Sequence, residues 1–268
     1  MEKLEHLSEI TNSYDTYIVD LWGVMHNGIK LNSSAINTIK KLFLNDKKIV
    51  FLSNAPRPSI NVVNFLKKLK MDDKYLKNVL TSGEAALKAI REETFGKRFY
   101  HLGPERDNSL FKNLEKNKTN IKECDYILCT GLFDDFENDL NYYRELLKKY
   151  TSKKLICTNP DLIVHRGEHE EYCAGKLASI FEDLGGEVKY FGKPHRDIYK
   201  LFLRENERAL AIGDNLRTDI KGANNMNIDS IFITDGVHRS ELKNESDLTA
   251  ILKKYKVRST YFQKELSW

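Results

Sequence analysis

Asp20 is the residue of this chain best placed to do chemistry. It ends a short run of β-forming residues, Tyr17–Val19, and the turn-prone Gly23 follows closely. In α/β proteins a carboxylate at the carboxyl end of a parallel strand lies where ligands bind. Such a carboxylate can attack phosphorus and form an aspartyl phosphate. Asp20 is therefore a candidate nucleophile.

Three further apolar runs also end in groups that suit phosphate chemistry. Ser53 and Asn54 follow one run, Lys193 follows the second, and Asp214 with Asp219 follows the third. Carboxylate oxygens hold Mg²⁺, which screens a nucleophilic carboxylate from the charge of a phosphate. A lysine and short polar donors bind the equatorial phosphate oxygens. A turn or a helix end would explain each residue alone, but the four ends in succession predict a phosphoryl-transfer site with Mg²⁺.

Alternating strand-forming and helix-forming segments must position these residues. The pattern predicts strands over Tyr17–Asp20, Lys48–Ser53, Ala209–Ile212, Ser230–Thr234 and Tyr261–Phe262. It predicts helices over Ala35–Asn45, Ile60–Leu69, Asp197–Glu205, Thr218–Met226 and Asp247–Tyr255. Strands that alternate with helices are typical of a parallel sheet with right-handed crossovers. The fold class is therefore α/β.

A second strand-and-helix region interrupts this pattern. Its predicted strands are Val79–Ser82, Lys97–Leu102, Tyr126–Cys129 and Leu155–Cys157. Its predicted helices are Gly83–Glu93, with Ser82 as the cap, Ser109–Glu115, Asn138–Tyr150 and Ala174–Leu184. The first pattern is expected to resume with the strand Lys189–Phe191. We predict one domain from residues 1–77 and 189–268 and an inserted domain from residues 78–188.

The composition favours a soluble protein whose partner is a small molecule. Of the 268 residues, 41% are hydrophobic and 31% are charged, and no apolar run approaches the roughly 18 residues of a membrane span. The acidic, amphipathic start is unlike a signal peptide, so we expect a cytoplasmic protein with no membrane partner. The net charge of +4 comes from scattered lysines, and no nucleic-acid partner is expected. The four cysteines form no CxxC pair and are expected to be buried thiols.

Taken together, the four strand ends resemble the motifs of the haloacid dehalogenase superfamily, which consists mostly of Mg²⁺-dependent phosphatases. The segments Val79–Leu87 and Cys157–Gly167, then GKPH, GDNLRTDI and FITDGVHR, resemble its class IIA, NagD-like branch. The resemblance covers nearly the whole chain. It implies a Rossmann-like, doubly wound parallel sheet with an inserted α/β type-2 cap domain. It also implies that the cap can form homodimer contacts.

The resemblance implies a role for each matching residue. Asp20 would be the nucleophile and a Mg²⁺ ligand, and Lys193 would neutralise nucleophile and phosphate. Asp214, Asp219 and the backbone carbonyl of Trp22 would be the other metal ligands. Ser53 and Asn54 would bind the phosphate, and the cap segment from Thr158 and Asn159 to Asp161 would face the substrate.

Trp22 is the one departure from the family pattern. The family has a second aspartate there, which protonates the leaving group, and an indole cannot do this. Loss of a general acid typically costs about 10²–10⁴-fold in rate. Three explanations are open. The leaving group needs no acid, a histidine (His26 or His195) supplies the proton, or the protein binds its ligand without turnover. The indole itself either stacks on a base or a sugar, or packs under the cap.

These observations predict a Mg²⁺-dependent phosphatase that acts through an aspartyl phosphate. Its substrate would be a small phosphorylated metabolite, namely a sugar phosphate, a nucleotide or an aryl phosphate. The alternative is a catalytically impaired relative that binds a phosphorylated metabolite. The intact Asp20, Lys193, Asp214 and Asp219 favour the enzyme, whereas Trp22 favours the binding protein.

Overall fold

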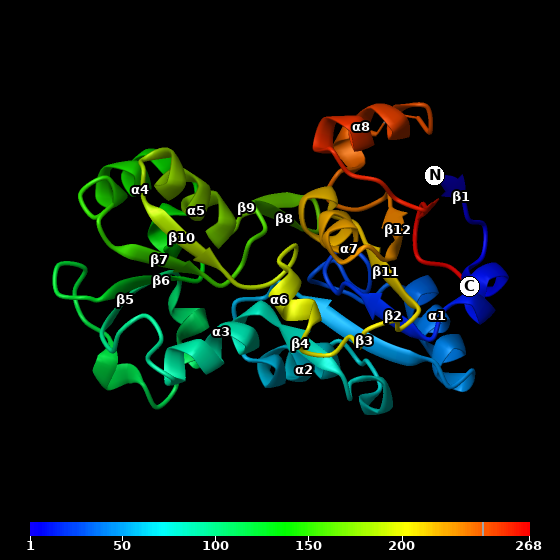
Figure 1. Ribbon diagram of the computed structural model, residues 1–268, viewed down its shortest axis with the longest axis horizontal. Coiled ribbons are helices and arrows are strands. Elements are labelled where there is room, and N and C mark those ends of the chain that lie inside the picture. Colours follow the sequence, from blue (N-terminus) through cyan, green and yellow to red (C-terminus); the bar gives the residue numbers. More distant parts are fainter. Residues whose placement is uncertain (243) are drawn as a thin grey trace.

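The computed structural model describes residues 1–242 and 244–268, which fold around two parallel sheets that lie side by side (Figure 1). The larger sheet has seven strands in the order β1-β13-β12-β11-β2-β3-β4, and all neighbours are parallel. These strands are β1 (Glu2–Lys3), β2 (Thr16–Val19), β3 (Lys48–Ser53), β4 (Val79–Thr81), β11 (Ala209–Gly213), β12 (Asp229–Ile233) and β13 (Tyr261–Gln263).

Helices cover both faces of this sheet, because successive residues of its central strands point to opposite sides. Val19 of β2 packs with the cluster that includes Ile39 and Leu66, on α1 (Ser33–Leu44) and α2 (Ser59–Lys68). The neighbouring Ile18 packs on the other face, against Tyr199. That face carries α6 (Arg196–Tyr199), α7 (Lys221–Met226) and, further along, α8 (Asp247–Tyr255). The doubly wound α/β fold is confirmed.

The smaller sheet has four parallel strands in the order β10-β7-β6-β5. They are β5 (Phe99–Leu102), β6 (Tyr126–Cys129), β7 (Lys154–Cys157) and β10 (Glu187–Tyr190). The helices packed on it are α3 (Ser82–Arg91), α4 (Leu140–Leu147) and α5 (Ala174–Asp183). An antiparallel hairpin, β8 (Ile163–Arg166) and β9 (His169–Tyr172), extends from this part toward the larger sheet (Figure 1). The sequence pattern did not predict this hairpin.

β4, at the start of the expected insertion, and β10, at its end, pair with different sheets. β4 pairs with β3 in the larger sheet, although the segment after residue 78 was assigned to the insertion. β10 pairs with β7 in the smaller sheet, although Lys189–Phe191 was expected to rejoin the first domain. Both strands are short, and their alternation does not reveal which sheet they join. We propose two domains whose limits lie after β4 and after β10.

Two predicted helix details are corrected. Thr81, not Ser82, caps α3, because its Oγ1 accepts the backbone N–H of Glu84 at 3.0 Å. The hydroxyl of Ser82 instead lies within hydrogen-bond distance of the carbonyl oxygens of Ala55 and Thr158. The helix expected over 197–205 stops at Tyr199. The predicted buried, unpaired cysteines are confirmed. Across the described residues, every helix is too short or too polar for a transmembrane span.

The cap has a titratable side chain, His101, buried in its core. Its ring lies in edge contact with Phe111, and Nε2 pairs with Thr130 Oγ1 at 2.9 Å. Burial, followed by the charge of Lys118, lowers the pKa of His101 to about 4. The unfolded chain, with a pKa near 6.5, therefore binds a proton between pH 6.5 and 4 that the folded chain does not. The contribution of His101 to the free energy of unfolding is therefore fully present above pH 6.5, and it is lost as the pH falls toward 4.

We expect His101→Gln, which keeps a polar atom near the Nε2 position, to flatten the acid limb of stability. Over pH 6.5 to 4 the wild type should lose up to about 3 kcal/mol more unfolding free energy than the variant. Urea unfolding at several pH values measures this difference. Parallel pH profiles for the two proteins would show that His101 does not titrate in this way.

Candidate active site

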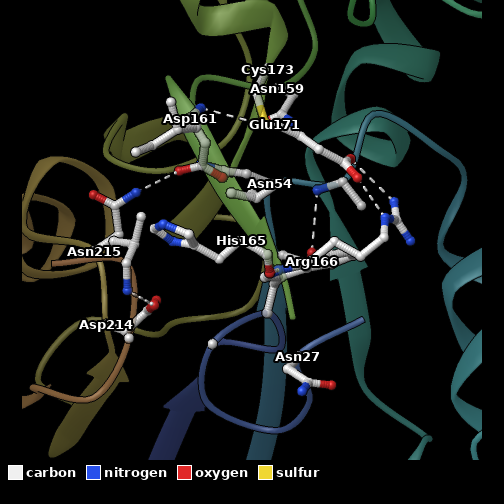
Figure 2. Close-up of a pocket in the computed structure, with 18 of the residues that line it drawn as sticks. Asn27, Asn54, Asn159, Asp161, His165, Arg166, Glu171, Cys173, Asp214 and Asn215 are labelled. Carbon is white, nitrogen blue, oxygen red and sulfur yellow. Dashed lines mark hydrogen bonds and ion pairs between the residues drawn. The ribbon is translucent and has the colours of Figure 1, made fainter. Parts of the chain in front are cut away.

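Three buried carboxylates meet at the carboxyl ends of neighbouring strands. Asp20 follows β2, and Asp214 and Asp219 follow β11, which is the strand beside it. One oxygen from each carboxylate lies within 4.8 Å of the others. They open into a cavity of about 780 Å³ that residues of both sheet regions line (Figure 2). The predicted convergence of strand ends is therefore observed.

Lys193, in the loop after β10, bridges two carboxylates of this acidic cluster. Its Nζ donates to Asp20 Oδ1 at 2.5 Å, to Asp219 Oδ1 at 2.6 Å and to the carbonyl of Leu52 at 2.8 Å. These contacts use all three ammonium hydrogens. The lysine is therefore oriented by its neighbours, and it is hydrogen-bonded to the Asp20 carboxylate.

Asn54 lines the cavity, and its side chain is also bonded to the loop that carries Lys193. Its Oδ1 accepts the backbone N–H of Lys193 at 2.8 Å, and its Nδ2 donates to the Lys193 carbonyl at 3.1 Å. In this structure both polar groups therefore hold the lysine loop. Ser53 is placed as expected: it lines the cavity, and its Oγ accepts the N–H of Ala55 at 3.2 Å, which leaves the hydroxyl hydrogen for a ligand.

Backbone groups fix the two carboxylates that follow β11. The N–H of Val237 donates to Asp214 Oδ2 at 2.7 Å, and the N–H of Asn215 donates to Asp219 Oδ2 at 3.1 Å. Gly23 passes so close that a Cβ there would lie 2.1 Å from Asp214 Oδ2, and its φ is +89°. Only glycine fits this position. The glycine that marked the turn in the sequence thus also makes room for the Asp214 carboxylate.

The cluster has more negative charge than Lys193 balances. Burial raises the pKa of Asp214 to about 8, and the charge of Asp219 adds to this effect. Burial and Asp219 also raise the pKa of Asp20 well above its usual range. Burial alone would lower the pKa of Lys193, but Asp20 and Asp219 raise it. A further cation would relieve this repulsion, and three hard oxygen donors suit Mg²⁺.

Two residues of the cap segment that was expected to face the substrate, Asn159 and Asp161, line the cavity. Asn159 lines the cavity, whereas Thr158 does not, because its hydroxyl donates to the Cys129 carbonyl inside the cap. Asp161 reaches across to the core: its Oδ1 accepts from Asn215 Nδ2 at 3.1 Å and from Thr218 Oγ1 at 2.9 Å (Figure 2). The resemblance placed Asp161 in this segment, but it gave no sign of the hydrogen bonds to the core.

Trp22 packs under the cap, as one of the two interpretations expected. Its Nε1 donates to the carbonyl of His165 at 2.8 Å, and the Arg166 guanidinium lies 5.3 Å from the ring centroid. His26 lines the cavity and packs edge-on against the indole, while burial lowers the pKa of His26 to about 4. His195 stacks on Tyr190 and is not among the residues that line the cavity.

The doubly wound sheet, the cap and the carboxylate cluster together define a hydrolase of the haloacid dehalogenase class. Residues 17–116 match the family model described as haloacid dehalogenase-like hydrolase, and residues 190–259 match one described as HAD-hydrolase-like. A haloacid dehalogenase-like hydrolase from Brucella suis 1330 is 31% identical with a TM-score of 0.86; the match covers 98% of this chain and 99% of that one.

Two further relatives carry more specific names. An acid sugar phosphatase from Staphylococcus epidermidis is 26% identical over 237 residues, which are 85% of this chain and 89% of the relative. A p-nitrophenyl phosphatase from Archaeoglobus fulgidus is 18% identical with a TM-score of 0.71, over 94% of this chain and 96% of that one. The chain belongs to the haloacid dehalogenase-like hydrolase family.

Proposed function

We propose that this protein is a Mg²⁺-dependent phosphatase that hydrolyses a small phosphorylated metabolite through an aspartyl phosphate on Asp20. The substrate class is a sugar phosphate, a nucleotide or an aryl phosphate. The observation that carries the proposal is the cluster of Asp20, Lys193, Asp214 and Asp219 at the floor of one cavity. The phosphatase names of the relatives support it.

Asp20 would attack phosphorus, forming a carboxylate oxygen–phosphorus bond as the ester P–O bond breaks. The electron pair of that bond leaves with the ester oxygen. Water would then attack phosphorus, which frees Asp20 and releases inorganic phosphate. Lys193 holds Asp20 in place for both steps. The hydroxyl of Ser53 would donate to a phosphate oxygen.

Mg²⁺ fits the site because its preferred ligands are hard oxygens and the cluster is short of positive charge. Asp20, Asp214 and Asp219 would hold it, together with the backbone carbonyl of Trp22. When bound, the ion would neutralise negative charge that gathers on the phosphoryl oxygens.

A catalytically impaired binding protein is the second candidate, and Trp22 is the observation that favours it. The indole N–H is already bonded to the His165 carbonyl, so it is not free to act on a leaving group. Even so, an acidic leaving group such as nitrophenolate departs without a proton donor. A phosphatase restricted to such esters would fit Trp22 as well as a binding protein does.

Hydrolysis of p-nitrophenyl phosphate with and without Mg²⁺ tests the proposal, and Asp214→Asn adds a specific expectation. Loss of one anionic ligand should raise the Mg²⁺ concentration for half-maximal rate at least about tenfold. Asp235→Asn is the matched control, since Asp235 is exposed at the rim of the same cavity, outside the cluster. If the wild type has no Mg²⁺-dependent phosphatase activity, the binding function becomes the better account.

A further inference from the structure

The spacing of two of the clustered carboxylates depends on one short backbone segment. Asp214 and Asp219 both follow β11, and a short helix begins between them at Leu216. Two N–H groups at its start have acceptors within the segment. Asn215 N–H donates to Asp219 Oδ2 at 3.1 Å, and Arg217 N–H donates to Asn215 Oδ1 at 2.9 Å. The N–H of Leu216, which lies between them, finds its acceptor outside the segment.

His238 supplies that acceptor from the loop after β12. Its Nε2 accepts the Leu216 N–H at 3.1 Å, and both residues are buried. A ring nitrogen that accepts a hydrogen bond carries no hydrogen, so the hydrogen of this imidazole is on Nδ1. Nδ1 lies 2.7 Å from Glu241 Oε1, to which it donates. Glu241 therefore selects the tautomer in which Nε2 can hold Leu216.

The helix α8 in turn holds Glu241. The Tyr255 hydroxyl donates to Glu241 Oε1 at 2.7 Å, and Lys254 pairs with Oε2. The Tyr255 ring also lies edge-on to the His238 imidazole, with 4.7 Å between centroids. The guanidinium of Arg217 lies 4.7 Å from the centroid of the same ring. One aromatic side chain thus contacts both His238 and the segment that His238 holds.

The loop that carries His238 also holds a carboxylate directly. The N–H of Val237 donates to Asp214 Oδ2 at 2.7 Å, so adjacent residues of one loop hold Asp214 and Leu216. Without the imidazole, the buried Leu216 N–H would lack a partner, and the backbone would move to relieve that cost. Such a movement would carry Asp219 with it, because Asp219 is bonded to the preceding N–H.

We propose that His238, oriented by Glu241, is a positioning residue for the divalent-cation site. It holds the Leu216 N–H so that the carboxylates of Asp214 and Asp219 keep the separation that one ion needs. Side chains that orient metal ligands without touching the metal typically contribute about 10–100-fold to metal affinity. This inference rests on the proposed Mg²⁺-dependent phosphatase function.

The experiment measures Mn²⁺ binding by EPR, which reports the free ion and needs no substrate. Asp214→Asn should weaken binding at least about tenfold, which assigns the measured ion to the carboxylate cluster. His238→Leu removes the acceptor from Leu216 and should raise the Mn²⁺ Kd about tenfold. His238→Gln has a side-chain oxygen that can accept the same N–H, so it should recover most of the affinity.

His101→Leu is the matched control for the loss of a buried imidazole. His101 is 4% exposed and His238 is 5% exposed, and each bonds through Nε2. His101 lies in the cap core and is not among the residues that line the cavity. Its replacement should lower stability but leave the Mn²⁺ Kd within about twofold. If His238 served stability alone, His238→Leu would give the same result.

A measurement on the wild type tests the inference without any variant. The ¹⁵N resonances of the His238 imidazole should show hydrogen on Nδ1 and none on Nε2, both with and without Mg²⁺. Hydrogen on Nε2 would overturn the inference, because that nitrogen could not then accept the N–H of Leu216. This result does not depend on whether His238→Leu folds.

Three binding results would overturn the inference and leave the phosphatase function intact. They are a Kd of His238→Leu within about twofold of the wild type, an equal loss in His101→Leu, and no recovery in His238→Gln. A wild type that binds no Mn²⁺, or whose binding is unchanged by Asp214→Asn, would overturn it as well. If that wild type also hydrolyses no phosphate ester with Mg²⁺, the proposed function falls with it.

Discussion

Asp20→Asn is expected to lower kcat for p-nitrophenyl phosphate by at least about a thousandfold. The amide keeps the shape of the side chain, but it lacks the charge and the nucleophilic oxygen needed to attack phosphorus. It also loses the charge that pairs with Lys193 at 2.5 Å. Steady-state kinetics at saturating Mg²⁺ would measure the loss.

Asp15→Asn is the matched control for this change. Asp15 lies just before the other end of the same strand, where it is exposed and pairs with Arg208. The chemical change is identical, but it falls outside the cavity, so activity should stay within about twofold. Equal activity in wild type and Asp20→Asn would show that Asp20 is not the nucleophile.

The second large effect concerns the leaving group. Because Trp22 cannot donate a proton to oxygen that departs, the wild-type rate should fall steeply as the leaving-group pKa rises. Alkyl and sugar phosphates should react at least about 10²-fold more slowly than nitrophenyl phosphate, the cost of an absent general acid. Trp22→Asp should then raise the ratio of alkyl to nitrophenyl rates by about tenfold or more.

Trp22→Asn controls for the damage that either substitution does to packing. Both variants lose the indole contact with the His165 carbonyl and leave a similar cavity, but only the aspartate can carry a proton. A rate that varies little with leaving-group pKa in the wild type would show that another group donates the proton. His26, which lines the cavity, would then be mutated before His195, which stacks on Tyr190.

The residues at strand ends could be predicted because side chains that suit phosphate chemistry directly follow the predicted strands. Asp20 and Asp214 each follow an apolar run, and the parallel strands β2 and β11 bring their carboxyl ends to one edge. Lys193 reaches the same cavity from the loop after β10, a strand of the smaller sheet. The contact of Asn54 with the lysine loop could not be predicted in the same way. Its side chain bonds to the backbone of Lys193, a partner 139 residues away, and no local pattern encodes such a contact.

Features that depend on contacts between the core and the cap could not be predicted from the sequence either. Asp161 accepts hydrogen bonds from Asn215 and Thr218, which approach it only in the folded chain. The β8–β9 hairpin consists largely of polar and charged residues that show no clean alternation. Strands β4 and β10 could be recognised as strands, but their sheet is decided by pairing across the chain.

The most direct test of the account is to trap the phosphorylated enzyme. Borohydride reduces an acyl phosphate to an alcohol, so protein quenched during turnover of p-nitrophenyl phosphate should carry homoserine in place of one aspartate. Peptide mass spectrometry locates that residue. We predict homoserine at position 20, dependent on both substrate and Mg²⁺. Turnover with no reduced aspartate, or with homoserine at another position, would contradict covalent catalysis by Asp20.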